Sequence, residues 1–234
     1  HESDITPGLA NKIAVPFANQ ICYSFPETIK YLPKSKSVFT GIPIRENLFQ
    51  GDKKLGKSLC SFNEDKPIIL VIGGSLGSKL LNSIIRNSLK TLLEDFQICH
   101  ICGKGNKDLS YTGIIGYKQF EYVGEELKHL FAMADLVISR AGATALNELL
   151  ALKKPNILIP LSRQASRGDQ ILNADSYKKQ GYSIVILEEN LNNNILIEKI
   201  KYLYKNREKY ILNMSKSHIG NGIKEVIKVI QNSI

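Results

Sequence analysis

The chain of 234 residues has no hydrophobic run long enough to cross a bilayer as a helix, and no secretory signal peptide is recognisable. Internal repeats and low-complexity segments are also lacking. The four cysteines (Cys22, Cys60, Cys99 and Cys102) do not have the spacing of a disulfide framework. These absences argue against a membrane-spanning or a disulfide-stabilised secreted protein, and we expect a reduced, cytosolic one.

Several catalytic and metal-binding signatures are missing as well. Cys99 and Cys102 show C-x-x-C spacing, but residues three apart in a strand point to opposite faces, and no second pair completes a tetrahedral site. The P-loop pattern fails because Lys79 is misplaced, and the spacing of G-x-G-x-x-G fails too. No Ser-His-Asp or Cys-His arrangement is recognisable. We interpret the two cysteines as core residues and predict neither a metal nor a cofactor.

The chain is basic, with a net charge of +9 and a pI of about 9.3. From Glu198 to Ile234 there are eight Lys or Arg residues against three Asp or Glu, so much of the excess lies near the C-terminus. This sign suits an anionic substrate or a membrane surface and identifies neither. The basic residues are not interleaved with aromatics as in nucleic-acid recognition motifs, so we do not expect nucleic acid as a partner.

Short apolar runs alternate with helix patterns from residue 68 onward. The runs lie at 68–72, 98–102, 120–123, 136–138, 157–159 and 184–187. The helix patterns lie at 79–93, 125–133, 144–152 and 169–180, and three more follow at 195–204, 208–214 and 223–230. The alternation predicts an α/β domain with a doubly wound, Rossmann-like parallel sheet covered on both faces.

Residues 1 to 40 have the character of the end of another domain. A short helix pattern (Leu9, Ile13 and Phe17) is followed by candidate strands at 21–23 and 38–39, and Gly41 to Pro43 is a candidate linker. The chain starts at His1 without Met, so we expect a fragment or a processed product.

The segment 134–161 carries the strongest functional signal. An apolar strand pattern ends at Ser139, and a loop of small residues leads into a helix whose single acid is Glu148. Small residues let a ligand approach the backbone and the helix N-terminus. A carboxylate one turn into the helix can accept hydrogen bonds from both hydroxyls of a ribose. The segment therefore predicts a nucleotide site.

Three further segments can be interpreted either as ligand-binding or as purely structural. Gly73, Gly74 and their neighbours form a glycine-rich turn after a strand, which suits a phosphate or is only a tight strand–helix connection. Arg45 follows a stiff turn and suits a diphosphate or is a solvated linker residue. Asp169 and Gln170 suit sugar hydroxyls, whereas the alternative for Asp169 is a helix N-cap.

Six segments occur in the order found in MurG-type glycosyltransferases, namely HESDITPGLANKI, GIPIREN, GGSLGSKLLN, CGKG, ADLVISRAGATALNEL and GDQILNA. The chain resembles this family from His1 to about Tyr182. The family transfers N-acetylglucosamine from UDP-N-acetylglucosamine onto lipid I, giving lipid II for peptidoglycan synthesis and hence for cell wall biogenesis, cell shape and cell division. Its architecture, GT-B, has two Rossmann-like domains facing a cleft.

The resemblance implies a domain division. Residues 1–42 would be the end of the N-terminal acceptor domain with its linker, 43–215 the UDP-sugar domain, and 216–234 a C-terminal helix packing back on the N-terminal part. The family's N-terminal glycine-rich GGH segment, with its proposed catalytic histidine, has no counterpart. The catalytic base is therefore unknown, the chain alone is expected to be inactive, and His1 and Glu2 are cleft candidates.

The resemblance also implies roles for single residues. Arg45 and Ser75 would bind the diphosphate beside the backbone of Gly73 and Gly74, and Glu148 would bind the ribose. The remaining predicted contacts are Ala143, Thr144 and Ala145 on the uridine side, Asp169 and Gln170 on the sugar, and Asn82 near the cleft. Two departures from the family pattern matter, since this chain has HESD for the frequent HEQN and Asp169-Gln170 for the frequent Gln-Gln.

The implied partners are UDP-N-acetylglucosamine, the lipid I acceptor and other cell-wall synthesis proteins. The implied location is the cytoplasmic face of the bacterial plasma membrane, as a peripheral protein. Two alternatives stay open. One is another UDP-sugar glycosyltransferase or an epimerase of the same architecture, and the other is a non-catalytic nucleotide-binding fragment.

Overall fold

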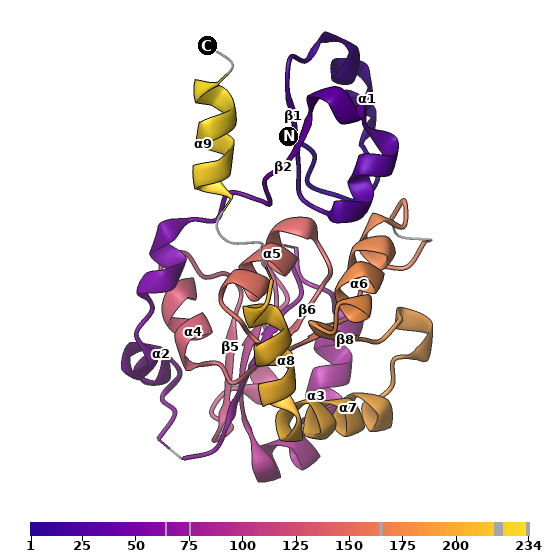
Figure 1. Cartoon of the computed structure of the whole chain (residues 1–234). Coiled ribbons are helices and arrows are strands. Elements are labelled where there is room, and N and C mark those ends of the chain that lie inside the picture. The colour runs from indigo at the N-terminus through magenta and orange to yellow at the C-terminus, as the bar shows by residue number, and fades with distance from the viewer. Residues whose placement is uncertain (64, 75, 164–165, 218–221, 233–234) are drawn as a thin grey trace.

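A parallel sheet of six strands forms the centre of the computed structural model, which describes residues 1–63, 65–74, 76–163, 166–217 and 222–232 (Figure 1). Its strands are β3 (Ile68–Ile72), β4 (Gln97–Ile101), β5 (Tyr117–Phe120), β6 (Leu136–Ser139), β7 (Asn156–Leu158) and β8 (Ser183–Val185). Their order in space is β5-β4-β3-β6-β7-β8. The first strand of this sheet, β3, lies in the middle. The next two strands, β4 and β5, lie on one side of it, and β6, β7 and β8 lie on the other. This is the strand order of a doubly wound dinucleotide-binding fold, and it confirms the predicted fold class.

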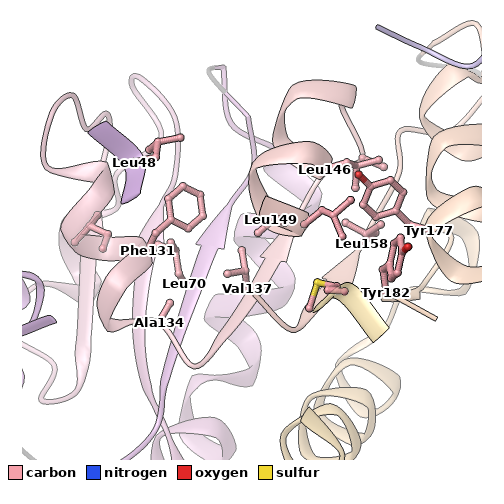
Figure 2. Packing of buried hydrophobic residues seen from close by; sticks show 14 of the residues in the cluster. Leu48, Leu70, Phe131, Ala134, Val137, Leu146, Leu149, Leu158, Tyr177 and Tyr182 are labelled. Carbon is pink, nitrogen blue, oxygen red and sulfur yellow. The ribbon is translucent and has the colours of Figure 1, made fainter. Parts of the chain in front are cut away.

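The two faces of the sheet are buried in two apolar clusters because side chains alternate along each strand. Leu70, Val137 and Leu158 point into one cluster, in which Figure 2 shows them packed with Leu146, Leu149 and the rings of Tyr177 and Tyr182. Their strand neighbours, such as Ile69, Val71 and Ile138, point into the other. Burial on both faces explains why these strands read as continuous apolar runs.

Helices cover both faces. The cluster of Leu70 is closed by α2 (Lys53–Cys60), α4 (Leu127–Met133), α5 (Ala143–Ala151), α6 (Asp169–Lys179) and α8 (Arg207–Ser215). The cluster of Ile69 is closed by α3 (Lys79–Asp95) and α7 (Asn193–Lys205). Their apolar residues recur every three or four positions, for example Leu81, Ile85, Leu89 and Leu92 on α3, so that each helix buries one stripe.

The N-terminal residues form a small separate sheet. β1 (Ile21–Tyr23) and β2 (Ser37–Phe39) pair in parallel, next to α1 (Leu9–Ala14), and Glu2 bridges to Tyr23. These strands were predicted at nearly the same residues. α9 (Ile223–Gln231) lies at the same end of the molecule (Figure 1), where the Gly222 N–H donates to the Ile42 carbonyl at 3.1 Å.

One local prediction was wrong, and one helix was not predicted. The third strand of the sheet covers 117–120 and not 120–123, because it alternates buried and half-buried residues as an edge strand and does not follow the apolar run. Helix α2 was not predicted. Asp52 caps it by accepting from the N–H groups of Lys54 and Leu55, and Gly56 lets it pack closely against the carbonyl of His129 on α4.

Within the part of the chain that the structure describes, no helix combines the length and apolar character needed to span a bilayer.

The loops after β3 and β4 pass each other with no room for a side chain. A Cβ at Gly77 would overlap the Cys102 carbonyl, and a Cβ at Gly103 would overlap the backbone of Gly77. Both glycines also have positive φ. The close approach therefore fixes the start of α3 against the end of β4.

We predict that Gly77→Ala lowers the free energy of unfolding far more than Gly105→Ala. The two glycines have similar φ angles of 74° and 72°, but a Cβ at Gly105 would meet nothing within 4 Å. Gly105→Ala should cost about 1–2 kcal/mol for the left-handed conformation alone, and Gly77→Ala about 1–3 kcal/mol more for the steric overlap. Urea denaturation of both variants measures the difference, and equal losses would refute the close packing.

Candidate functional site

The predicted nucleotide segments meet at the point where the sheet reverses its direction of growth. β3 and β6 are neighbours, yet α3 leaves β3 toward one face while α5 leaves β6 toward the other. The two connecting loops therefore diverge at the carboxyl edge of the sheet. Such switch points are the usual ligand crevices of open α/β sheets.

The start of α5 offers backbone donors to a ligand. Its N-cap is Gly142, which has no side chain to cap the helix and no atom within 4 Å of where a Cβ would stand. Ala143 is buried, Ala145 is half-buried and Thr144 is exposed. There is therefore open space beside Gly142 at the start of the helix, where the first N–H groups favour an anion or a polar base edge.

The glycine-rich turn after β3 has one position that opens outward. A Cβ at Gly73 would stand 3.0 Å from the Ser78 nitrogen, whereas a Cβ at Gly74, with φ of 93°, would meet nothing within 4 Å. Gly74 is therefore the glycine of this turn that leaves room for a ligand. Ser75, the predicted diphosphate contact, lies outside the described residues.

Arg45 and Glu148, predicted for the diphosphate and the ribose, lie together although 103 positions separate them in the sequence. Arg45 Nη2 is 3.8 Å from Glu148 Oε1, and the arginine side chain is 64% exposed against 13% for the glutamate. Burial raises the pKa of Glu148, and the nearby Arg45 lowers it in part. The pair presents an acceptor and a donor fork on the same side of α5.

Gln170 and Asp169 begin α6 beside the same loops. Gln170 Oε1 accepts from the N–H groups of Ala141 and Leu161, so it joins the loops after β6 and β7. The N-cap alternative for Asp169 is wrong, because Gly168 is the N-cap and Asp169 makes no capping bond. The Asp169 carboxylate instead accepts from the Thr6 hydroxyl at 2.6 Å and pairs with Arg167 at 2.8 Å.

Asn82 is buried among protein partners. Its Nδ2 donates to the Cys102 carbonyl at 3.0 Å, and its Oδ1 is 3.0 Å from His100 Nε2. His100 is fully buried, and burial with the nearby Arg86 lowers its pKa to about 3, so the ring is neutral. This geometry gives Asn82 a part in holding α3 on β4, and its predicted contact with a substrate stays a prediction.

His1 and Glu2 are engaged within the N-terminal segment. His1 Nε2 is 2.9 Å from the Gly41 carbonyl oxygen. The buried carboxylate of Glu2 accepts from the Asp4 and Gly8 N–H groups and from the Asn11 amide. Glu2 thus fixes the loop before α1, which is a structural role that the interpretation as a cleft residue did not foresee.

The cysteines of the C-x-x-C pair are buried, free thiols, as predicted for core residues. Cys99 packs in the cluster of Leu70, and burial raises its pKa. Among the described residues no three His, Cys, Asp or Glu side chains are grouped as a metal site would need.

Asn173, which the sequence analysis did not single out as a site residue, ties the N-terminal segment to the sheet. It is fully buried, its Oδ1 accepts from the Ile5 N–H at 3.3 Å, and its Nδ2 donates to Asp4 Oδ1 at 2.8 Å and to the Ala141 carbonyl. No pattern within the GDQILNA segment shows this role, because the partners lie 168, 169 and 32 residues away.

A cavity of about 730 Å³ opens at the carboxyl ends of β7 and β8. It borders α6 at Ile171, the residue that follows Gln170. Among the described residues, it is lined by Ser162, Arg163, Ile171, Leu187, Glu188 and Glu189. The volume is in the range of small-molecule sites.

The chain was compared with known protein families. Residues 68–230 match the glycosyltransferase family 28 C-terminal domain. The chain belongs to this family. The family-28 match covers all six strands of the main sheet and both loops at the switch point.

Two curated relatives of this family-28 chain carry the name UDP-N-acetylglucosamine–N-acetylmuramyl-(pentapeptide) pyrophosphoryl-undecaprenol N-acetylglucosamine transferase. The protein of that name from Clostridium tetani (strain Massachusetts / E88) is 56% identical over 231 residues, which are 99% of this chain and 64% of the relative. The one from Clostridium perfringens (strain SM101 / Type A) is 55% identical over 233 residues, which are 100% and 65%. The chain thus spans 64–65% of these relatives' length.

Solved structures agree with the fold. The crystal structure of Acinetobacter baumannii MurG superposes with a TM-score of 0.76 at 25% identity, covering 99% of this chain and 65% of that one. The glycosyltransferase of kitacinnamycin superposes with a TM-score of 0.71 at 16% identity over 93% of this chain and 56% of that one, which bears on the fold alone. The predicted resemblance to MurG-type glycosyltransferases is confirmed.

We predict that Glu148→Gln raises the free energy of unfolding at pH 7. A carboxyl with a raised pKa binds its proton more tightly in the folded chain than in the unfolded one, so its ionisation destabilises the fold as the pH rises above the ordinary pKa of 4.5. Glutamine removes that penalty. Urea denaturation at pH 7 and pH 4 should show a gain at pH 7 that disappears at pH 4, where the wild-type carboxyl is protonated. A loss of stability at pH 7 would mean that the carboxylate is a structural acceptor.

Proposed function

We propose that this chain is the donor-binding part of an enzyme that transfers N-acetylglucosamine from UDP-N-acetylglucosamine to lipid I, giving lipid II. The observation that carries the proposal is the meeting of Arg45, Glu148 and the open start of α5 at the switch point of the sheet. The names of the relatives support the same activity for the longer proteins of which this chain spans 64–65%.

The proposed arrangement follows the two loops. The uridine lies at Ala143, Thr144 and Ala145, where the first turn of α5 offers N–H groups, and Glu148 accepts from the ribose hydroxyls. The diphosphate lies over Gly73 and Gly74, with Ser75 and Arg45 as further donors. The sugar lies toward Gln170, whose oxygen is already used by two N–H groups.

The proposed reaction is one inverting displacement. The acceptor hydroxyl oxygen attacks the anomeric carbon, the bond from that carbon to the β-phosphate oxygen breaks, and UDP leaves with the electron pair. A base takes the hydroxyl proton. Arg45 and the backbone at the start of α3 stabilise the charge that develops on the leaving diphosphate. We assign the base to a group outside this chain, as the resemblance to MurG-type enzymes implies. Of the described histidines, His100 is buried, His1 Nε2 is 2.9 Å from the Gly41 carbonyl oxygen and His129 Nδ1 accepts from the Asp52 N–H.

The proposed setting is the cytoplasmic face of the plasma membrane, where the lipid-linked acceptor would be met by a peripheral enzyme. The net charge of +9 supports contact with an anionic surface and with the diphosphates of both substrates. The division into an acceptor-domain remnant (1–42), a donor domain (43–215) and a returning helix (216–234) is part of the same proposal.

Calorimetry with the chain tests the donor. UDP and UDP-N-acetylglucosamine should bind, and Glu148→Gln should weaken both by about 1–3 kcal/mol because the ribose hydroxyls lose a charged acceptor. Equal binding of UDP-glucose would favour a different UDP-sugar enzyme of the same architecture. Absence of UDP binding would refute the proposal. Transfer to a lipid I analogue by the chain alone would refute the assignment of the base to a group outside this chain.

We further predict that Gly142→Ala weakens UDP binding at least about tenfold with little change in stability. Gly142 has φ of −68° and open space around its Cβ position, so the fold accepts alanine and only a bound ligand would meet the methyl group. Gly8→Ala is the matched control, because Gly8 is also a helix N-cap with φ of −66° and its Cβ position lies 3.9 Å from the nearest atom. Weaker binding in both variants, or in neither, would contradict the site.

A further inference from the structure

Arg140 joins the carboxyl ends of four strands although no substrate role was predicted for it. It follows β6, and the residue is only 9% exposed. Its Nη1 donates to the Ile159 carbonyl after β7 at 3.0 Å and pairs with Glu188 Oε1 after β8 at 2.7 Å. Its Nη2 donates to the Ser78 hydroxyl after β3 at 2.6 Å.

Glu188 is the group that keeps this guanidinium in place. A buried arginine needs a counter-charge, and Glu188 supplies it. The other carboxylate oxygen of Glu188 accepts from the Ser162 N–H at 2.9 Å, so both oxygens are held. Burial raises the pKa of Glu188, but the hydrogen bonds from Ser162 and Arg140 outweigh it and hold the pKa below its usual value. The carboxylate is therefore charged at neutral pH.

Ser78 passes this restraint to the start of α3. Its hydroxyl oxygen accepts from Arg140 and also from the Leu81 N–H at 3.2 Å, which is the N-cap bond of the helix. A hydroxyl has two acceptor positions, and both are used. The rotamer of Ser78, and with it the first turn of α3, is thus tied to the Arg140–Glu188 pair from the far half of the sheet.

We propose that Glu188 is a positioning residue for the diphosphate of the donor, acting through Arg140 and Ser78 on the anion-binding start of α3. The inference rests on the proposed function, which places the diphosphate beside Gly73 and Gly74. Glu188 touches no substrate in this arrangement. Its loss releases Arg140 from Ser78 and loosens the helix start, while the uridine end at α5 keeps its own contacts.

The test compares UDP with uridine, which has the same base and ribose but no phosphate. Glu188→Gln should weaken UDP binding by about tenfold, the size expected for a misplaced helix terminus facing an anion, and leave uridine binding unchanged. Calorimetry measures UDP, and ligand-observed NMR measures uridine. Glu188→Asp, which keeps the charge on a shorter side chain, should restore part of the UDP affinity.

The control is Glu198→Gln, which neutralises an exposed glutamate paired with Lys199 at 2.8 Å on α7 and should alter neither affinity. Equal losses for UDP and uridine in Glu188→Gln would show a general structural role and overturn the proposal, as would unchanged or tighter UDP binding. Wild-type chain that binds no UDP would overturn the proposed function and this inference together. Circular dichroism on each variant verifies that it is folded before the affinities are compared.

Discussion

The close passage of the loops after β3 and β4 is the constraint on which the proposed nucleotide site depends. Gly77 and Gly103 let two backbones meet where neither would tolerate a Cβ. The contact fixes α3 at its first turn, and Asn82 then fastens the helix to β4 through the Cys102 carbonyl and the neutral ring of His100. With that end held, Gly74 is left as the open position of the turn. The turn therefore has a tightly packed backbone at Gly77 and one open position at Gly74. Close approach of a diphosphate to the backbone requires both.

In the second half of the sheet, polar side chains join the loops at the strand ends in addition to the backbone ladder. Gln170 joins the loops after β6 and β7, and Arg140 reaches from β6 to three other strand ends. Two kinds of contact therefore act on the start of α3. Steric exclusion at Gly77 and Gly103 fixes it against the end of β4, and the hydrogen bond from Arg140 to Ser78 ties it to the loops of the other half of the sheet.

Much of the fold could be predicted from the sequence because its signals are local. Buried parallel strands appear as apolar runs, and helices such as α3 show their stripe within one segment. The ribose role of Glu148 was suggested by its place one turn into a helix after small residues. Arg140 could not be found in this way, since its Ser78 partner lies 62 residues away and nothing near either residue signals the contact. Helix α2 was missed for a related reason, because its buried residues are Gly56 and Cys60 and the close fit of Gly56 against the His129 carbonyl involves a residue far away in the sequence.

The two departures from the family pattern lie in one cluster. Asp4 stands at the last position of HESD, and Asp169 is the first residue of the Asp169-Gln170 pair that begins α6. Burial raises the pKa of Asp4, the bond from Asn173 lowers it, and the neighbouring Asp169 and Glu2 raise it again. The negative charge of Asp169 has a local partner, because its carboxylate pairs with Arg167 and also accepts from the Thr6 hydroxyl. A carboxylate engaged on both oxygens is a poor sugar ligand, whereas the adjacent Gln170 still presents an amide. The changed residues thus act on the contact between the N-terminal segment and α6, and in the proposed arrangement Gln170 is the residue of this pair that can contact the sugar.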